Sequence, residues 1–237
     1  MRLLNSFKPR ITGLCEVTAA VTTTKTSSAS IRTISLQGAT KRFNGRAIFE
    51  NLDLEIHNGQ AWSITGANGS GKSTLIKAIS GFFGLSSGNI SWESDHGPID
   101  PANIHKHCAL AAPYLELFEE FTLEENIKIY GDLKNFKQGM SDIDVLEFID
   151  LAHASKKRLK EFSSGMKQRT KLGLAFCANT GLLLLDEPLS NLDSKGYEWY
   201  RNVPQALLDN RIVIVGSNLE GDETRFCHHN IHMAVTQ

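Results

Sequence analysis

The spacing of apolar and polar residues predicts strands in the first part of the chain. From Ile31 onward the two kinds of position alternate and β-branched residues are frequent, a combination typical of β-strands. Further strands are expected at Leu52–Ile56, Ala61–Thr65 and Ser87–Ser94. The strands before Ala61 predict an antiparallel β layer that leads into a central strand.

The middle of the chain carries the 3.6-residue period of helices. We expect residues of about 113–180 to be mostly helical, with amphipathic segments that begin near Leu123 and Ser141. Ser141 predicts a helix start, because its side chain can cap the helix and Asp144 follows three residues later. An inserted helical subdomain is therefore expected at about 113–170.

Two apolar runs in the C-terminal part, Leu182–Pro188 and Arg211–Ser217, predict buried strands. Strands that alternate with helices are typical of a parallel, doubly wound sheet covered by helices. The predicted fold class is therefore α/β, with a doubly wound, mostly parallel sheet, an N-terminal antiparallel β layer and the helical insertion. One domain is expected at 31–237.

Residues 1–30 differ from the rest in composition. They hold ten Ser or Thr residues, four Lys or Arg residues and one acid, Glu16. Disorder is one interpretation, because the segment has no usable apolar period. The same basic, Ser/Thr-rich bias is typical of organelle transit peptides, and this alternative stays open.

The overall composition narrows the class of protein. The chain has 25 Lys and Arg residues against 26 Asp and Glu, and 41% of its residues are hydrophobic. These values are near the averages for soluble globular proteins. A formal charge of -1 argues against bulk attraction to nucleic acid, so no nucleic-acid partner is expected. The four scattered cysteines fit a reducing cytosol better than a disulfide framework.

Gly66–Ser73 reads GANGSGKS, which fits the phosphate-binding pattern G-x-x-x-x-G-K-[ST] between a predicted strand and a predicted helix. Glycines permit a tight turn whose backbone N–H groups surround phosphate oxygens, and the helix N-terminus adds partial positive charge. Lys72 is expected to reach the β- and γ-phosphates of ATP, and Ser73 to ligate Mg²⁺. The predicted phosphate-binding residues are Gly66, Ala67, Asn68, Gly69, Ser70, Gly71, Lys72, Ser73 and Thr74.

The strand Leu182–Pro188 ends in two carboxylates that suit the second half of such a site. Asp186 is expected at the carboxyl end of its strand, near the Mg²⁺. Glu187 follows it and is expected to orient or deprotonate a water. Without the phosphate loop, the same residues would be read as a solvated acidic turn.

Two further segments carry a family resemblance, FSSGMKQR at Phe162–Arg169 and SNLD at Ser190–Asp193. Together with GANGSGKST and LLLLDEP, and in this order, they resemble the ATP-binding cassette of ABC transporters. The resemblance runs from about Ile31 to the end of the chain, and it is closest to small subunits whose signature reads SxGMKQR. It implies the fold of P-loop NTPases.

The resemblance also implies roles for single residues. Phe43 matches the aromatic residue that stacks on adenine, with a plain β-core phenylalanine as the alternative. Ser163 and Gly165 would bind the γ-phosphate held by an opposing second cassette, in a homodimer or a heterodimer. Asp193 matches a loop that couples the two sites, and its alternative role is a helix N-cap.

Two positions depart from the family pattern. Counting back from Thr122 places Pro113 where the family has a glutamine that helps to bind Mg²⁺. Asn218 stands where the family has a histidine that holds the γ-phosphate and the catalytic glutamate. Asparagine can donate and accept hydrogen bonds but carries no proton or charge. We expect Asn218 to keep the positioning role and hydrolysis to persist at a rate slowed by both departures.

The sequence is therefore interpreted as the ATP-hydrolysing subunit of an ABC transporter, which drives separate membrane-spanning permease subunits. Such a subunit is expected in the cytoplasm, attached to the inner face of a membrane. Two alternatives stay open. One is a nucleotide-gated adaptor with slow turnover, and the other is a soluble ABC ATPase that works outside transport.

Overall fold

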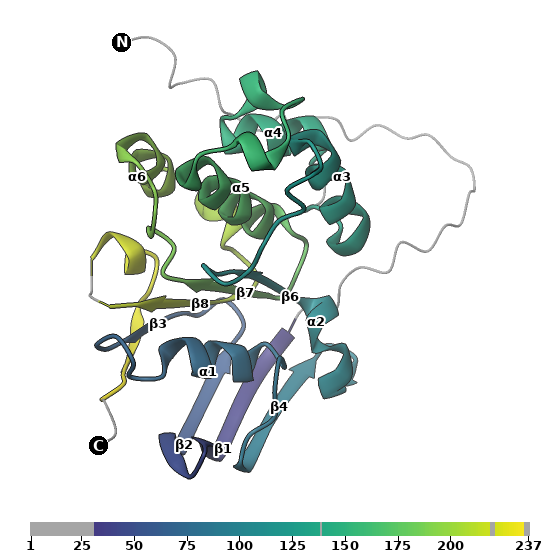
Figure 1. Cartoon of the computed structure of the whole chain (residues 1–237). Coiled ribbons are helices and arrows are strands. Elements are labelled where there is room, and N and C mark those ends of the chain that lie inside the picture. The colour runs from purple at the N-terminus through teal and green to yellow at the C-terminus, as the bar shows by residue number, and fades with distance from the viewer. Residues whose placement is uncertain (1–30, 138, 219–220, 235–237) are drawn as a thin grey trace, which may run out of the picture.

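The computed structural model describes residues 31–137, 139–218 and 221–234, and the interpretations of residues 1–30 lie outside this range. Figure 1 shows three stacked parts: an antiparallel sheet with helix α1, a central parallel sheet, and a group of helices on the far side. This arrangement confirms the predicted fold class. Within the described residues, no helix combines the length and hydropathy of a membrane-crossing segment.

The antiparallel sheet has the strand order β2-β1-β4-β5. Its hairpin turns at Asn44 and Gly45, whose positive φ angles of 50° and 80° suit a tight two-residue turn. The second strand starts before the predicted Leu52, because bulged pairing with the first strand continues to the hairpin. The strands are β1 (Ile31–Phe43), β2 (Arg46–His57), β4 (Ser87–Ser94) and β5 (Gly97–Pro98).

The central sheet has the order β6-β7-β8-β3-β9, and each pair of neighbouring strands in it is parallel. The sequence did not predict its strand at Cys108–Ala111, because CALA is short and contains no β-branched residue. The strands are β3 (Ala61–Thr65), β6 (Cys108–Ala111), β7 (Leu182–Asp186), β8 (Ile212–Ser217) and β9 (His229–His232).

Alternate residues of the central strands pack against different layers. On one face Leu182 and Leu184 join the core around α1 and β1. On the other face Leu183 and Leu185 join the core around the helices. A strand buried on both faces needs a continuous apolar run, which explains the LLLL sequence.

The helices follow the predicted periods with one exception. Ser141 and Thr122 each form a capping box with an acid three residues later. Residues 113–121 are not helical, contrary to the expectation of a mostly helical segment from 113. Asn126 holds this loop by bonding both backbone groups of Phe118. The helices are α1 (Lys72–Ile79), α2 (Ile104–His107), α3 (Leu123–Lys134), α4 (Asp142–Ile149), α5 (Ser164–Cys177) and α6 (Ser194–Arg201).

One buried cation ties the helical group to the sheet. Arg211 precedes β8 and is 1% exposed. Its guanidinium donates to the carbonyl oxygens of Ala175, Phe176 and Ala178 at the end of α5, at 3.5, 3.0 and 3.3 Å. Burial lowers the pKa of Arg211 to about 10. Arg211 therefore satisfies helix-terminal carbonyls that would otherwise be buried without donors.

Replacing Arg211 by alanine should destabilise the fold strongly. The change removes three donors and leaves space in the core, so the free energy of unfolding should fall by about 3–5 kcal/mol. Urea denaturation followed by circular dichroism measures this. Arg201→Ala is the matched control, because Arg201 forms an exposed ion pair with Asp222 and should change stability by less than about 1 kcal/mol. Equal effects of both substitutions would contradict the capping role.

Candidate functional site

The loop between β3 and α1 has the close backbone contacts that a phosphate cradle needs. A Cβ atom on Gly66 would lie 2.3 Å from the Met233 carbonyl oxygen, and one on Gly71 would lie 2.5 Å from Ile48. Gly66 and Gly71 have φ angles of 151° and 99°, which side chains disfavour. The N-terminus of α1 begins at Lys72, directly after Gly71. The loop can therefore offer N–H groups and the helix dipole to an anion.

Lys72 points its ammonium group back over this loop. Its Nζ donates to the carbonyl oxygens of Gly66 and Ala67, at 2.9 and 3.0 Å, and to Asn218 Oδ1 at 2.8 Å. The residue is 4% exposed, so the charge is withdrawn from bulk water. Its three hydrogen-bond acceptors are neutral, so the ammonium group can still attract an anion such as a phosphate.

Asp186 ends β7 next to the loop, and it is 1% exposed. The Asp186 Oδ1 has no hydrogen-bond partner among the described residues. Burial raises the pKa of Asp186 above its usual range; Glu187 adds to this, and the Ser73 hydroxyl, Lys72 and Lys77 oppose it by lowering the pKa.

These oxygens fit a hard divalent cation such as Mg²⁺, which takes few protein ligands and keeps waters. In the described part of the chain, no group of three or more His, Cys, Asp or Glu residues could hold a metal. Ser73 and Asp186 are the candidate ligands, because a hydroxyl and a carboxylate both supply oxygen ligands.

Glu187 lies directly after the sheet ends. Its φ of 46° is left-handed, which is uncommon for a residue other than glycine and often marks a functional constraint. Its backbone N–H donates to the Gly216 oxygen at 2.9 Å. Asn218 Nδ2 donates to Glu187 Oε1 at 3.4 Å, while the Asn218 oxygen accepts from Lys72. One asparagine therefore bridges the loop lysine and the carboxylate.

Phe43 lies at the end of β1 and is 46% exposed. Its ring packs edge-on against Phe83, with 5.8 Å between centroids, and Lys41 Nζ lies 4.9 Å from the Phe43 centroid. Phe43 is therefore only partly buried, and its stacking on a planar ligand stays a prediction.

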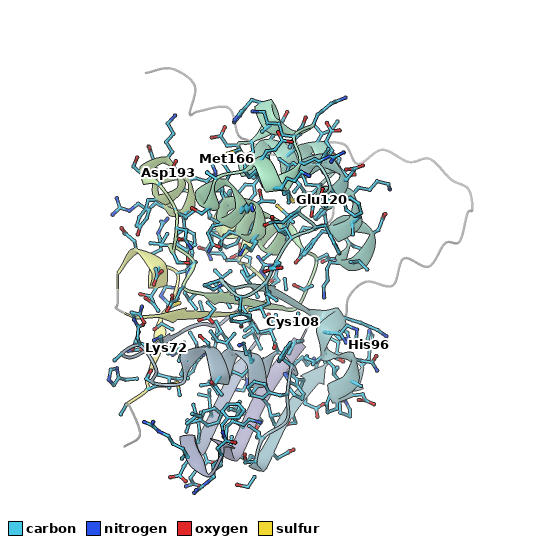
Figure 2. All side chains as sticks on the ribbon, in the orientation of Figure 1. Lys72, His96, Cys108, Glu120, Met166 and Asp193 are labelled. Atoms are coloured by element: carbon cyan, nitrogen blue, oxygen red, sulfur yellow. The ribbon has the colours of Figure 1, made fainter. Side chains whose placement is uncertain are left out.

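The signature residues lie apart from the loop. Ser163 is the N-cap of α5 and accepts from the Met166 N–H at 3.2 Å. In Figure 2, Met166 is high on the helical group, and Lys72 lies well below it at the start of α1. Asp193 is the N-cap of α6, and its side chain accepts a hydrogen bond from the Gly196 N–H at 2.8 Å. The helix N-cap role, given above as the alternative for Asp193, is therefore observed. One chain therefore brings together Lys72, Ser73, Asp186, Glu187 and Asn218 but not Ser163 or Gly165.

Two contacts beside the site were not predicted. Tyr114 comes directly after Pro113, and the centroid of its ring lies 3.8 Å from Lys77 Nζ. Burial raises the pKa of Tyr114, and the charge of Asp186 adds to this. Buried Gln168, within the signature, donates to the Pro188 oxygen at 3.0 Å. The only sequence signal for these contacts was proximity to a motif, because each joins distant segments.

Similar proteins were found by sequence. A family model described as "ABC transporter" matches residues 49–190, more than half of the chain. An uncharacterised ABC transporter ATP-binding protein of Bacillus subtilis is 27% identical over 191 residues, 80% of this chain and 62% of that protein. An Fe(3+) ions import ATP-binding protein of Fusobacterium nucleatum is 34% identical over 168 residues, 68% of this chain and 44% of that protein. The chain thus spans less than two thirds of either relative.

Solved structures share the fold. A putative ABC transporter ATP-binding protein from Pyrococcus furiosus superposes with a TM-score of 0.70 at 20% identity, covering 85% of this chain and 97% of that one. A dimeric ATP-binding cassette in a post-hydrolysis state, bound to ADP and Pi, gives a TM-score of 0.71 at 22% identity, with 86% and 97% coverage.

Asp186→Asn should stabilise the protein when no nucleotide or metal is present. The raised pKa means that ionising Asp186 at pH 7 opposes folding, and an amide removes that charge. We expect the thermal midpoint at pH 7 to rise by about 2–4 °C, which corresponds to about 1 kcal/mol in a protein of this size. The difference should shrink as the pH falls through the raised pKa of Asp186, because both side chains are then neutral.

Differential scanning calorimetry with and without Mg²⁺ and ADP measures this effect. The wild type should gain stability from the added ligands, and Asp186→Asn should gain less. Asp193→Asn is the control, since asparagine caps a helix as well as aspartate does. A lower midpoint for Asp186→Asn without ligands would mean that the carboxylate serves the fold.

Proposed function

The chain belongs to the ABC transporter family, and on that basis we propose that it binds and hydrolyses ATP to power transport through separate membrane subunits. The observation that carries the proposal is the bridge from Lys72 through Asn218 to Glu187. It connects a cation at a phosphate-binding loop with a carboxylate able to accept a proton. Phosphoryl transfer needs both groups, held in fixed positions.

Each residue of the site has a definite task in this proposal. Lys72 and the N–H groups of residues 66–74 bind the phosphate oxygens, and Phe43 stacks on adenine. Glu187 accepts a proton from the attacking water, and Asn218 orients Glu187. Mg²⁺, when bound to Ser73 and Asp186, neutralises charge on the phosphate oxygens.

The reaction is proposed to need a second cassette. Ser163 is exposed at the start of α5, where a hydroxyl, the Gly165 N–H and the helix terminus form an anion site. This site and Lys72 lie on different parts of one chain (Figure 2). A second chain, identical or related, would bring its α5 to the phosphate bound by Lys72. Supporting this, a solved neighbour of the same fold is dimeric.

We propose that separate membrane subunits dock at a hollow of the helical group. A hollow of about 150 Å³ lies between the loop 115–118 and α3, lined largely by apolar residues. Phe118 and Leu133 at this hollow are 57% and 71% exposed. Exposed apolar residues around a hollow are typical of protein-binding sites. Such a partner would attach the chain to the cytoplasmic face of a membrane, and the cargo would be chosen by the partner.

One observation favours a second candidate function, a nucleotide-gated adaptor that turns over slowly. Asn218 occupies the bridging position with a neutral amide, and its 3.4 Å contact with Glu187 is long for a hydrogen bond. Pro113 offers no side-chain oxygen to a metal. An adaptor would bind ATP, dimerise and release a partner with little hydrolysis. A soluble ABC ATPase outside transport remains the third candidate, distinguished by co-purification without a membrane partner.

Glu187→Gln should separate an ATPase from an adaptor. Removing the proton acceptor should lower single-turnover hydrolysis at least about 100-fold, while ATP binding persists and a dimer accumulates. Radiolabelled phosphate release and size-exclusion chromatography with Mg²⁺ and ATP measure the two results. Glu147→Gln, an exposed change on α4, is the control. No hydrolysis by the unmutated chain in any assembly would favour the adaptor.

Asn218→Ala should slow hydrolysis about tenfold or more, because Glu187 and Lys72 both lose a positioning partner. Asn218→His should retain more activity than alanine, since imidazole can accept from Lys72 and donate to Glu187. Steady-state phosphate release at saturating ATP measures both. A rate for Asn218→Ala equal to that of the unmutated chain would show that the asparagine has no positioning role.

A further inference from the structure

Glu223 cross-links two segments that carry site residues. It lies in a single helical turn, η5 (Asp222–Thr224), after β8. Its Oε1 accepts from the Leu189 backbone N–H at 3.1 Å, and its Oε2 accepts from the Ser217 hydroxyl. One carboxylate therefore holds a loop and a strand end at a fixed separation.

Both segments lead directly to the bridge described above. Leu189 comes two residues after Glu187, and Ser217 comes directly before Asn218. The register of β7 and β8 ends at Asp186 and Gly216. Beyond that point the sheet pairing no longer sets the distance between the segments that follow β7 and β8. One backbone bond, from the Glu187 N–H to the Gly216 oxygen, still joins them. The Glu223 carboxylate is a further connection between these two segments, because it binds Leu189 and Ser217.

The turn that carries Glu223 is itself held in place. The hydroxyl of buried Tyr200 donates to the Glu223 carbonyl oxygen at 2.8 Å. Within the turn, the Thr224 N–H donates to the Gly221 oxygen at 3.1 Å, and the Gly221 N–H donates to Thr224 Oγ1 at 3.1 Å. A carboxylate on an anchored backbone loses little further freedom when it binds two donors, so its contacts can restrain other groups.

We infer that Glu223 is a positioning residue whose carboxylate sets the distance between Glu187 and Asn218. This inference rests on the proposed hydrolysis of ATP. Among the described residues, the hydrogen bonds of Glu223 go to Leu189, Tyr200 and Ser217, and none goes to Lys72 or to residues 66–74. Its loss should therefore affect the chemical step more than nucleotide binding, because small displacements of a proton acceptor reduce rate steeply.

The test compares Glu223→Ala, Glu223→Gln and Asp222→Asn in the full chain, with whatever partner supports hydrolysis. Asp222 is the matched control, because it neighbours Glu223 but pairs with exposed Arg201. For Glu223→Ala we expect kcat to fall about 10–100-fold, with KM for ATP and the affinity for a fluorescent ADP analogue within about twofold. Glu223→Gln keeps one accepting oxygen, so its loss should be smaller. Asp222→Asn should leave all three values unchanged.

Hydrogen–deuterium exchange gives a readout that does not depend on hydrolysis. In Glu223→Ala the Leu189 amide should exchange at least about tenfold faster, because its acceptor is gone, while the amides of β7 stay protected. If the alanine variant does not fold, the glutamine variant is judged on the same measurements. An unchanged kcat, an equal loss of kcat and ADP affinity, or an unchanged Leu189 exchange rate would overturn the inference.

Failure of the proposed function has a different result. If the unmutated chain hydrolyses no ATP in any assembly, the proposed reaction is wrong, and Glu223 is judged on exchange alone. Faster exchange at Leu189 then supports the restraint on the two segments, and unchanged exchange overturns it.

Discussion

The arrangement of the site depends on one desolvated ammonium group. Lys72 lies at the start of α1 and is held by two loop carbonyls and by Asn218, with almost no exposure to water. A buried cation is tolerated only when its donors are paired, so the loop must curl back and the end of β8 must lie beside it. The neighbouring glycines allow this curl, since side chains at Gly66 or Gly71 would collide with Met233 or Ile48. Loop geometry, strand order and the Asn218 contact are thus linked.

The carboxyl ends of β7 and β8 collect groups that do not favour folding by themselves. Asp186 is a buried carboxylate with an unpartnered oxygen, and Glu187 has a left-handed backbone. Unpaired charge and strained backbone are tolerated where the surrounding structure is stable and the residue has a function. That stability comes from the apolar run of β7, which packs against separate cores on its two faces. The sheet therefore supports a site that lowers its stability.

The helical group is connected to this edge through polar contacts as well as packing. Gln168 of α5 donates to the carbonyl of Pro188 beside this edge, and among the helices themselves Trp199 of α6 donates to the Phe148 oxygen near the end of α4. Arg211 joins the other end of α5 to the start of β8. Buried hydrogen bonds of this kind are directional, so a shift of α5 would displace the loop after Glu187. This is a physical route by which nucleotide and partner could influence one another.

The sequence alone determined the features that depend on local chemistry. Strand and helix periods predicted β3, β4, α3 and α4, and the patterns GANGSGKS and LLLLDEP predicted two halves of a site, because each needs specific residue types at short spacing. Only the tertiary structure decided how these parts meet. The family resemblance predicts Asn218 beside Glu187, but not its bond to Lys72. The Glu223 cross-link, the strand β6 and the contact of Tyr114 with Lys77 also join residues far apart in the chain, with no periodic signal. Such contacts arise where the sheet order brings strand ends together, and the order of strands follows from the packing of whole layers.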